Sequence, residues 1–179
     1  MVAALWVVLA AAPLAAQNFP QFGDDLFRPR LRQPGKYVMW LPTPDAMVER
    51  MLVAAKTTSQ DLVHDPGAGD GRIPIAAAKQ FGATAVGIEY DVDLAALARR
   101  NAERAGVAGK VTIVQGDIFK EDFSRATVVT LYLLPDLNQQ LRPRLLGMKP
   151  GTRVVSHAWD MGEWEPDATF RVGDSEAFL

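Results

Sequence analysis

The sequence predicts an α/β domain, a three-layer sandwich in which helices cover both faces of a mostly parallel sheet. Strand-like and helix-like periodicity alternate along residues 37–179, which is the pattern of parallel strands joined by crossover helices. A glycine-rich loop at 65–71 lies between the first expected strand and the helix that follows it. The chain has 179 residues, of which 49% are apolar and 22% charged, and this is the make-up of one domain.

The expected elements follow one another in a regular order. A helix opens at Thr43 and Pro44, with Thr43 as its N-cap and Pro44 in the first turn, where the missing N–H costs nothing. Gly106 closes a later helix, and the apolar run at 126–133 is expected to be a strand buried on both faces. In chain order, we expect strands at 61–64, 85–89, 111–115, 126–133 and 153–157, and helices at 72–80, 92–105 and 134–145, the last kinked or interrupted at Pro143.

The end of the chain predicts an antiparallel hairpin. Residues 170–172 and 177–179 flank a turn at Gly173 and Asp174. The second strand stops as it begins, so we expect either a truncated hairpin or a sheet with an unusually short last strand.

The first 16 residues are all apolar and predict a signal peptide or a membrane anchor. They fall short of the roughly 20 residues that span a bilayer as a helix, and residues 14–17 resemble a cleavage region. These two features favour a secretory signal peptide and export. The leader contains no positive charge, however, whereas Arg28, Arg30 and Arg32 follow it, which supports the alternative of an anchor that keeps the domain on the cytoplasmic side. A misassigned start codon is the third alternative. Residues 17–36 are predicted to be a linker, and 37–179 the globular domain.

Composition excludes several classes of site. The chain has no cysteine, so disulfides, thiolate metal sites and a cysteine nucleophile are excluded. With only His64 and His157, we predict no metal site. A formal charge of -2 indicates no surface built to bind nucleic acid.

The loop at 65–71 has the features of a ligand-binding turn. Its glycines let the backbone turn sharply and approach a ligand, and the next helix offers free N–H groups at its N-terminus. A dinucleotide-binding loop has its third glycine one residue later, where this chain has Arg72. Asp65 and Asp70 would repel a pyrophosphate but not a ligand with a positive centre, such as S-adenosylmethionine. The residues predicted here to bind S-adenosylmethionine are Asp65, Gly67, Gly69 and Gly71.

Two further acids follow neighbouring strands. Glu89 closes the second strand, where an acid can accept hydrogen bonds from both ribose hydroxyls. Asp117 follows the third strand, where its carboxylate can accept from an adenine amino group with Ile118 beside the ring. Glu89, Asp117 and Ile118 therefore complete the predicted cofactor site.

These residues resemble the class I S-adenosylmethionine-dependent methyltransferases over roughly 42–167. More narrowly, the chain is similar to the family that contains the mitochondrial protein-lysine methyltransferases of the ATP synthase c-subunit and the adenine nucleotide translocase, with bacterial and archaeal relatives. This similarity rests on Leu-Pro-Thr-Pro at 41–44, Gly-Asp-Gly-Arg at 69–72, Val-Thr-Leu-Tyr-Leu-Leu-Pro at 129–135, Ser-His at 156–157 and Asp-Met-Gly-Glu-Trp at 160–164.

The resemblance implies a seven-stranded Rossmann-like sheet with an antiparallel final strand, and methyl transfer to a lysine amine of a protein substrate. The chain departs from the family at His64 and Pro66, and Pro66 removes one backbone donor from the loop, which would weaken cofactor binding. It also stops where the family's last strand is expected, which would leave a sheet edge unpaired. A leader that indicates export conflicts with a cofactor made in the cytoplasm.

Methyl transfer from a sulfonium requires alignment and exclusion of water rather than a metal, so it leaves a faint residue signature. The crevice of such a sheet lies at the carboxyl ends of its strands. We expect catalytic residues among Tyr132, Asp136 and His157, with Pro135, Trp159 and Asp160 nearby, and we expect His64 to be structural.

Three alternatives remain open from the sequence. One is a methyltransferase-like binding protein without activity, and another is a small-molecule methyltransferase. The third is a nicotinamide-dependent oxidoreductase, against which Asp70 and Arg72 argue.

Overall fold

A computed structural model describes residues 22–179 of the chain. The expected leader at 1–16 and the first residues of the expected linker lie outside this range. Within it, no helix is both long and apolar enough to cross a membrane.

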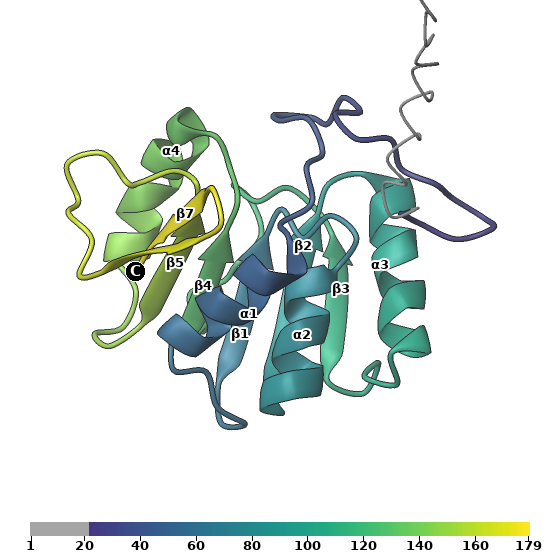
Figure 1. Ribbon diagram of the computed structural model, residues 1–179, viewed down its shortest axis with the longest axis horizontal. Helices are drawn as coiled ribbons and strands as arrows, with labels where there is room; N and C mark the ends of the chain where they lie inside the picture. The colour runs from purple at the N-terminus through teal and green to yellow at the C-terminus, as the bar shows by residue number, and fades with distance from the viewer. Residues whose placement is uncertain (1–21) are drawn as a thin grey trace, which may run out of the picture.

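Seven strands form a single sheet with the order β3-β2-β1-β4-β5-β7-β6 (Figure 1). The first five of these run parallel, and β7 pairs antiparallel with both β5 and β6. The predicted Rossmann-like α/β sheet with an antiparallel final strand is therefore confirmed. The strands are β1 Leu62–Pro66, β2 Thr84–Glu89, β3 Val111–Gln115, β4 Val128–Leu131, β5 Arg153–His157, β6 Thr169–Val172 and β7 Ser175–Phe178.

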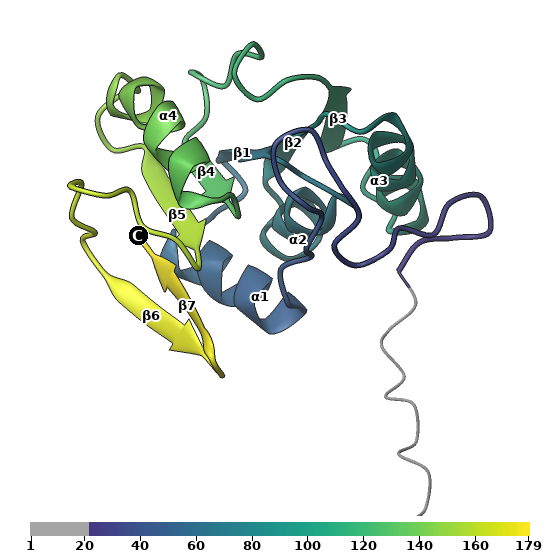
Figure 2. The same ribbon diagram turned by 90° about the horizontal axis from the view of Figure 1, so that it is seen from above.

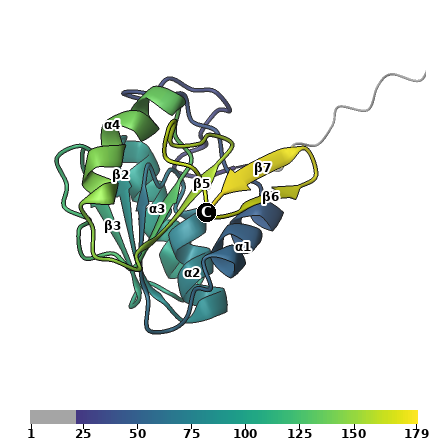
Figure 3. The same cartoon turned by 90° about the vertical axis from the view of Figure 1, so that its left-hand side faces the viewer.

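Helices cover both faces of the sheet, as Figures 2 and 3 show from two sides. They are α1 Asp45–Ala54, α2 Arg72–Phe81, α3 Val92–Arg104 and α4 Pro135–Leu146. The apolar residues of α1, α2 and α3 form one buried core, and those of α4 form a second core on the other side. Adjacent residues of β4 serve opposite cores, because Val128 belongs to the first and Val129 to the second.

Two predicted element ends differ from the structure. The strand expected at 126–133 is shorter, since β4 covers only Val128–Leu131. The N-cap of α1 is Pro44 rather than Thr43, and no side chain caps this helix. Thr43 is instead buried, and its Oγ1 lies 3.3 Å from His157 Nδ1 at the end of β5. A tertiary contact thus replaces the expected local capping bond.

The C-terminal hairpin forms with a short β7, so of the two expected alternatives the structure shows the unusually short last strand, and the sheet edge beside β5 is paired. Strand β7 has only four residues but lies inside the sheet, where Ala177 pairs with His157 on one side and Phe170 on the other. Gly173 makes the tight turn with a positive φ of 58°. Because Ala177 is fully buried, a short strand is enough to pair β5 with the hairpin.

The described part of the expected linker packs against the domain. Residues 22–41, which we call the strap, run from α3 to the start of α1 across the carboxyl ends of the parallel strands (Figure 1). The carboxylate of Asp24 pairs with Arg100 at 2.6 Å and Arg104 at 3.0 Å, both on α3. Two backbone bonds, from Arg32 N to Trp40 O and from Trp40 N to Gln33 O, close its second half into a loop.

Candidate active site

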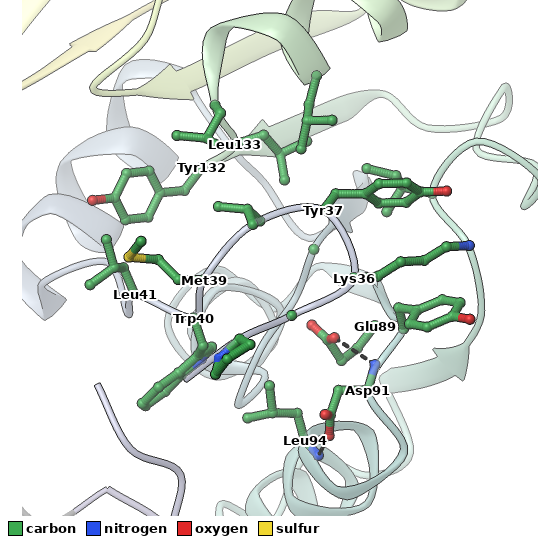
Figure 4. Close-up of a pocket in the computed structure, with 18 of the residues that line it drawn as sticks. Lys36, Tyr37, Met39, Trp40, Leu41, Glu89, Asp91, Leu94, Tyr132 and Leu133 are labelled. Atoms are coloured by element: carbon green, nitrogen blue, oxygen red, sulfur yellow. Dashed lines mark hydrogen bonds between the residues drawn. The ribbon is translucent and has the colours of Figure 1, made fainter. Parts of the chain in front are cut away.

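A cavity with about 1010 Å³ of empty space, part of it open to solvent, lies beneath the strap at the carboxyl ends of β1, β2 and β4 (Figure 4). Its walls come from the strap at 33–41, the glycine loop, the turn after β2, the turn after β3 and the segment after β4. Among the residues predicted from the sequence, the cavity is lined by Gly67, Glu89, Ile118, Tyr132 and Trp159.

The glycine loop has a conformation that requires glycine at three positions. Gly67, Gly69 and Gly71 have positive φ values of 92°, 56° and 81°. A Cβ at position 69 would lie 2.7 Å from Trp40 Nε1, and one at position 71 would lie 2.9 Å from Ala98 Cβ. The loop therefore combines left-handed backbone with close approach of the strap on one side and α3 on the other.

Glu89 faces this loop from the end of β2. Its Oε2 accepts a hydrogen bond from Gly69 N at 2.8 Å, and its Oε1 accepts one from Asp91 N at 2.9 Å. Burial raises the pKa of Glu89, although these backbone bonds oppose the shift. The carboxylate lies at the cavity wall (Figure 4), and its role as the acceptor of ribose hydroxyls stays a prediction.

The two aspartates that flank the loop have different environments. Asp65 is buried, and burial raises its pKa to about 7, with the neighbouring Glu89 and Asp70 adding to the shift. Its Oδ1 accepts a hydrogen bond from Thr130 Oγ1 at 2.8 Å. Asp70 instead forms a two-point ion pair with Arg72, at 3.0 and 2.7 Å. The charge of Asp70 is therefore paired within the loop, so repulsion of a pyrophosphate would come mainly from the other acids of the site.

Asp117 does not itself line the cavity, and the strap residues Lys36 and Tyr37 cover its carboxylate. Its Oδ2 accepts from Lys36 Nζ at 2.7 Å and from Tyr37 OH at 3.1 Å, and its Oδ1 accepts from Phe119 N at 3.0 Å. The hydrogen bond from Lys36 holds its pKa below the usual range. Ile118 lines the cavity, whereas the carboxylate predicted to receive an adenine amino group already has three donors.

Tyr132 is the predicted catalytic candidate that reaches the cavity. It follows β4, and its ring centroid lies 4.0 Å from that of His157, which is buried and does not line the cavity. Burial lowers the pKa of His157 to about 4, so this imidazole is neutral at physiological pH. Burial also raises the pKa of Tyr132, which keeps its hydroxyl protonated. His157 thus packs against the ring of Tyr132, and Thr43 in turn contacts His157.

The other predicted candidates lie elsewhere. Asp136 is exposed in the first turn of α4, and neither it nor Pro135 lines the cavity. Asp160 borders a second cavity beside β5 and accepts from Gly162 N. His64 is buried within β1, and burial lowers its pKa. These positions are close to the site in sequence, but none of them lines the cavity.

Sequence reasoning missed several lining residues. Asp91 caps α3 through Leu94 N at 2.8 Å, and both residues line the cavity. Asp91 could have been found as the N-cap two residues after Glu89. The strap residues Trp40 and Met39 carry no periodic signal, and only the tertiary structure places both in the cavity wall, with Trp40 against Gly69 of the glycine loop.

The chemistry of the lining matches an adenosine derivative with a positive centre. Leu94, Ile118 and Leu133 supply apolar surface for a ring system, and Glu89 supplies a carboxylate that can accept from hydroxyls. The carboxylates of Glu89 and Asp91 disfavour a phosphate. Among residues 22–179, no group of three or more metal-ligating side chains could hold a metal ion.

Comparison with known proteins identifies relatives of this chain. The sequence profile of the ANTKMT methyltransferase domain matches residues 65–168. A protein-lysine N-methyltransferase of Saccharolobus islandicus is 46% identical over 140 residues, which are 77% of this chain and 87% of that protein. The mouse lysine N-methyltransferase of the ATP synthase c-subunit is 35% identical over 131 residues, and the aligned region spans only 52% of its length.

A solved structure agrees with these relatives. A Salinibacter ruber protein, described as an RNA methyltransferase in complex with S-adenosyl-L-homocysteine, has a TM-score of 0.76 and 52% identity. The match covers 77% of this chain and 91% of that one. These relatives bind the demethylated cofactor or are named for methyl transfer, and they leave no support for a nicotinamide-dependent oxidoreductase. The chain therefore belongs to the ANTKMT methyltransferase domain family, and it is a methyltransferase that uses S-adenosylmethionine.

Proposed function

We propose that this methyltransferase transfers a methyl group to the side-chain amine of a lysine in a protein. The observation that carries the proposal is an apolar rim around the mouth of the cavity. Met39, Leu41, Leu134 and Trp159 all line the cavity, and each is 38–48% exposed. Exposed apolar side chains that converge on a site favour a protein segment over a small polar molecule.

The relatives support the lysine acceptor. The Saccharolobus islandicus protein is named for protein-lysine methylation, and this chain covers 87% of it. The mouse proteins related to this chain are named for lysines of the ATP synthase c-subunit and of the adenine nucleotide translocase. The Salinibacter ruber relative is instead described as an RNA methyltransferase. The net charge of -2 favours a protein over RNA as the acceptor.

The chain's own residues orient the reactants and exclude water. When bound, S-adenosylmethionine supplies an activated methyl group, whose carbon–sulfur bond breaks as the acceptor nitrogen attacks, so a neutral thioether leaves. The glycine loop and Glu89 would hold the cofactor in place for this transfer. Tyr132, beside the loop and within the apolar rim, would receive the acceptor amine at its hydroxyl oxygen.

A lysine amine must lose its proton before it can attack. The apolar rim desolvates the entering side chain, and desolvation lowers the pKa of an ammonium group. The hydroxyl of Tyr132 stays protonated because burial raises its pKa, so its oxygen accepts from the amine rather than removing a proton from it. The proton then leaves to solvent before the amine is enclosed. This division assigns Tyr132 an orienting role.

The acceptor class can be tested with the full-length protein, deuteromethyl S-adenosylmethionine and a cell extract separated afterwards into protein, RNA and small molecules. We expect labelled methyl groups on lysine side chains, identified by peptide mass spectrometry. Glu89→Gln should abolish most of the label, whereas Asp93→Asn, an exposed acidic control on α3, should not. Label confined to RNA or to small molecules would overturn the lysine acceptor, and cofactor binding without label would favour the inactive alternative.

A further inference from the structure

The carboxylate of Asp117 accepts three hydrogen bonds from its own chain, two of them at Oδ2. Lys36 Nζ and Tyr37 OH both bind Oδ2, at 2.7 and 3.1 Å, and Phe119 N binds Oδ1. The side chain of Asp117 is 7% exposed and that of Lys36 is 29% exposed, so water screens this ion pair only in part. An adenine amino group is also an N–H donor, so it would compete with the ammonium of Lys36 for the carboxylate of Asp117.

Aromatic rings hold Lys36 in this position. Its Nζ lies 4.2 Å from the ring centroid of Tyr90 and 4.8 Å from that of Tyr37. Tyr37 in turn packs edge-on against Phe119, with ring centroids 5.4 Å apart. The ammonium therefore lies between the turn after β2 and the turn after β3, in the cavity wall (Figure 4).

The strap is anchored by further contacts on either side of this ion pair. Asp24 anchors one part to α3, and Trp40 packs against Gly69 at the other end. Backbone bonds between Gln33, Arg32 and Trp40 close the loop at its base. Of the hydrogen bonds in the described chain, those from loop residues 34–39 to the rest of the domain are the two made to Asp117. Asp117 is thus the one carboxylate that holds the loop by hydrogen bonds, while Tyr37 packs on Phe119 and Val38 packs against the second core.

We propose that Lys36 is an intramolecular competitor of the cofactor, and that its ion pair with Asp117 latches loop 34–39 over the adenine end of the cavity until S-adenosylmethionine displaces it. This inference deepens the cofactor assignment and rests on Asp117 as the residue that receives the adenine amino group. The latch lowers the apparent affinity, because only the unlatched fraction of the protein offers a free carboxylate to the ligand.

Lys36→Met tests the latch, because methionine keeps an unbranched side chain of similar length and removes the charge. Titration calorimetry with S-adenosylhomocysteine at low salt is expected to give about tenfold tighter binding than wild type. Raising the salt concentration should tighten wild-type binding and leave the variant unchanged, since salt weakens only the latch. Lys120→Met is the matched control, because Lys120 is exposed, lies three residues after Asp117 and makes no ion pair in the described chain.

The opposite sign would overturn the proposal. If Lys36 instead closes over a bound cofactor and holds it, Lys36→Met will bind more weakly than wild type, and unchanged affinity would likewise contradict a latch. The effect must also pass through Asp117, so Lys36→Met should add nothing in an Asp117→Ala background, and tightening there would refute the mechanism. A wild-type protein that binds no S-adenosylhomocysteine at all would count against the cofactor assignment itself rather than against the latch.

Discussion

The two halves of the cavity are built in different ways. The half formed by β1 and β2 depends on backbone geometry, namely three glycines with positive φ and a carboxylate bonded to backbone N–H groups. The half formed by β4 and β5 depends on side chains from distant segments, since Tyr132 leans on His157, which meets Thr43 from before α1. Changes in the first half should alter cofactor affinity and stability, whereas changes in the second should alter turnover alone.

The largest expected effect concerns the buried carboxylate of Asp65. Its pKa of about 7 lies above the unfolded value of 3.8, so the folded protein binds a proton that the unfolded chain releases. The contribution of Asp65 to stability is therefore retained below pH 4 and falls as the pH rises toward 7, by up to about 4 kcal/mol. Asp65→Asn removes this pH dependence. The free energy of unfolding of the variant should therefore rise relative to that of wild type as the pH increases from 4 to 7.

Urea unfolding at several pH values measures this difference. Asp93→Asn serves as the control, because Asp93 is exposed on α3 and should run parallel to wild type. Parallel curves for Asp65→Asn as well would mean that Asp65 is not held neutral in the folded state.

Gly71→Ala should break the backbone-built half. Position 71 has a φ of 81°, and an added Cβ would lie 2.9 Å from Ala98 Cβ. Strain and overpacking together should cost about 3 kcal/mol of unfolding free energy. Gly109→Ala is the comparison, because nothing lies within 4 Å of a Cβ at that position. Equal denaturation midpoints for the two variants would contradict the close approach of α3.

Glu89→Gln should weaken cofactor binding more than it destabilises the fold. The amide keeps the shape of the carboxyl group but loses the negative charge that faces a positive ligand. It also has one acceptor oxygen in place of the two that accept from Gly69 N and Asp91 N. We expect S-adenosylmethionine affinity to fall by about 30-fold, or about 2 kcal/mol. Calorimetry measures it, and an affinity within twofold of wild type would remove Glu89 from the cofactor site.

Tyr132→Phe should have the smallest effect and the most selective one. Removing the hydroxyl leaves the ring against His157, so cofactor affinity should stay unchanged while kcat falls by about tenfold. Single-turnover kinetics with saturating cofactor would detect this. A loss of cofactor affinity in place of kcat would erase the distinction between the two halves.

The same division explains what the sequence predicted. Gly67, Gly69, Gly71 and Glu89 were identifiable because their roles follow from local conformation and from position at a strand end. The ion pair of Lys36 with Asp117 joins residues 81 apart, and the bond between Thr43 and His157 joins residues 114 apart, so neither leaves a local signal. Thr43 shows the limit of local patterns. Its position predicted a helix cap, but its hydroxyl bonds to His157 instead.

The alternation of β4 between two cores links folding to chemistry. Val128 and Val129 pack on opposite sides of the sheet, so sliding this strand by a single position would turn each core residue to the wrong layer. The same slide would carry Tyr132 out of the cavity wall, since it follows the strand directly. A misaligned chain would therefore be both unstable and unreactive, because the same strand register that fills the two cores also places the tyrosine in the cavity wall.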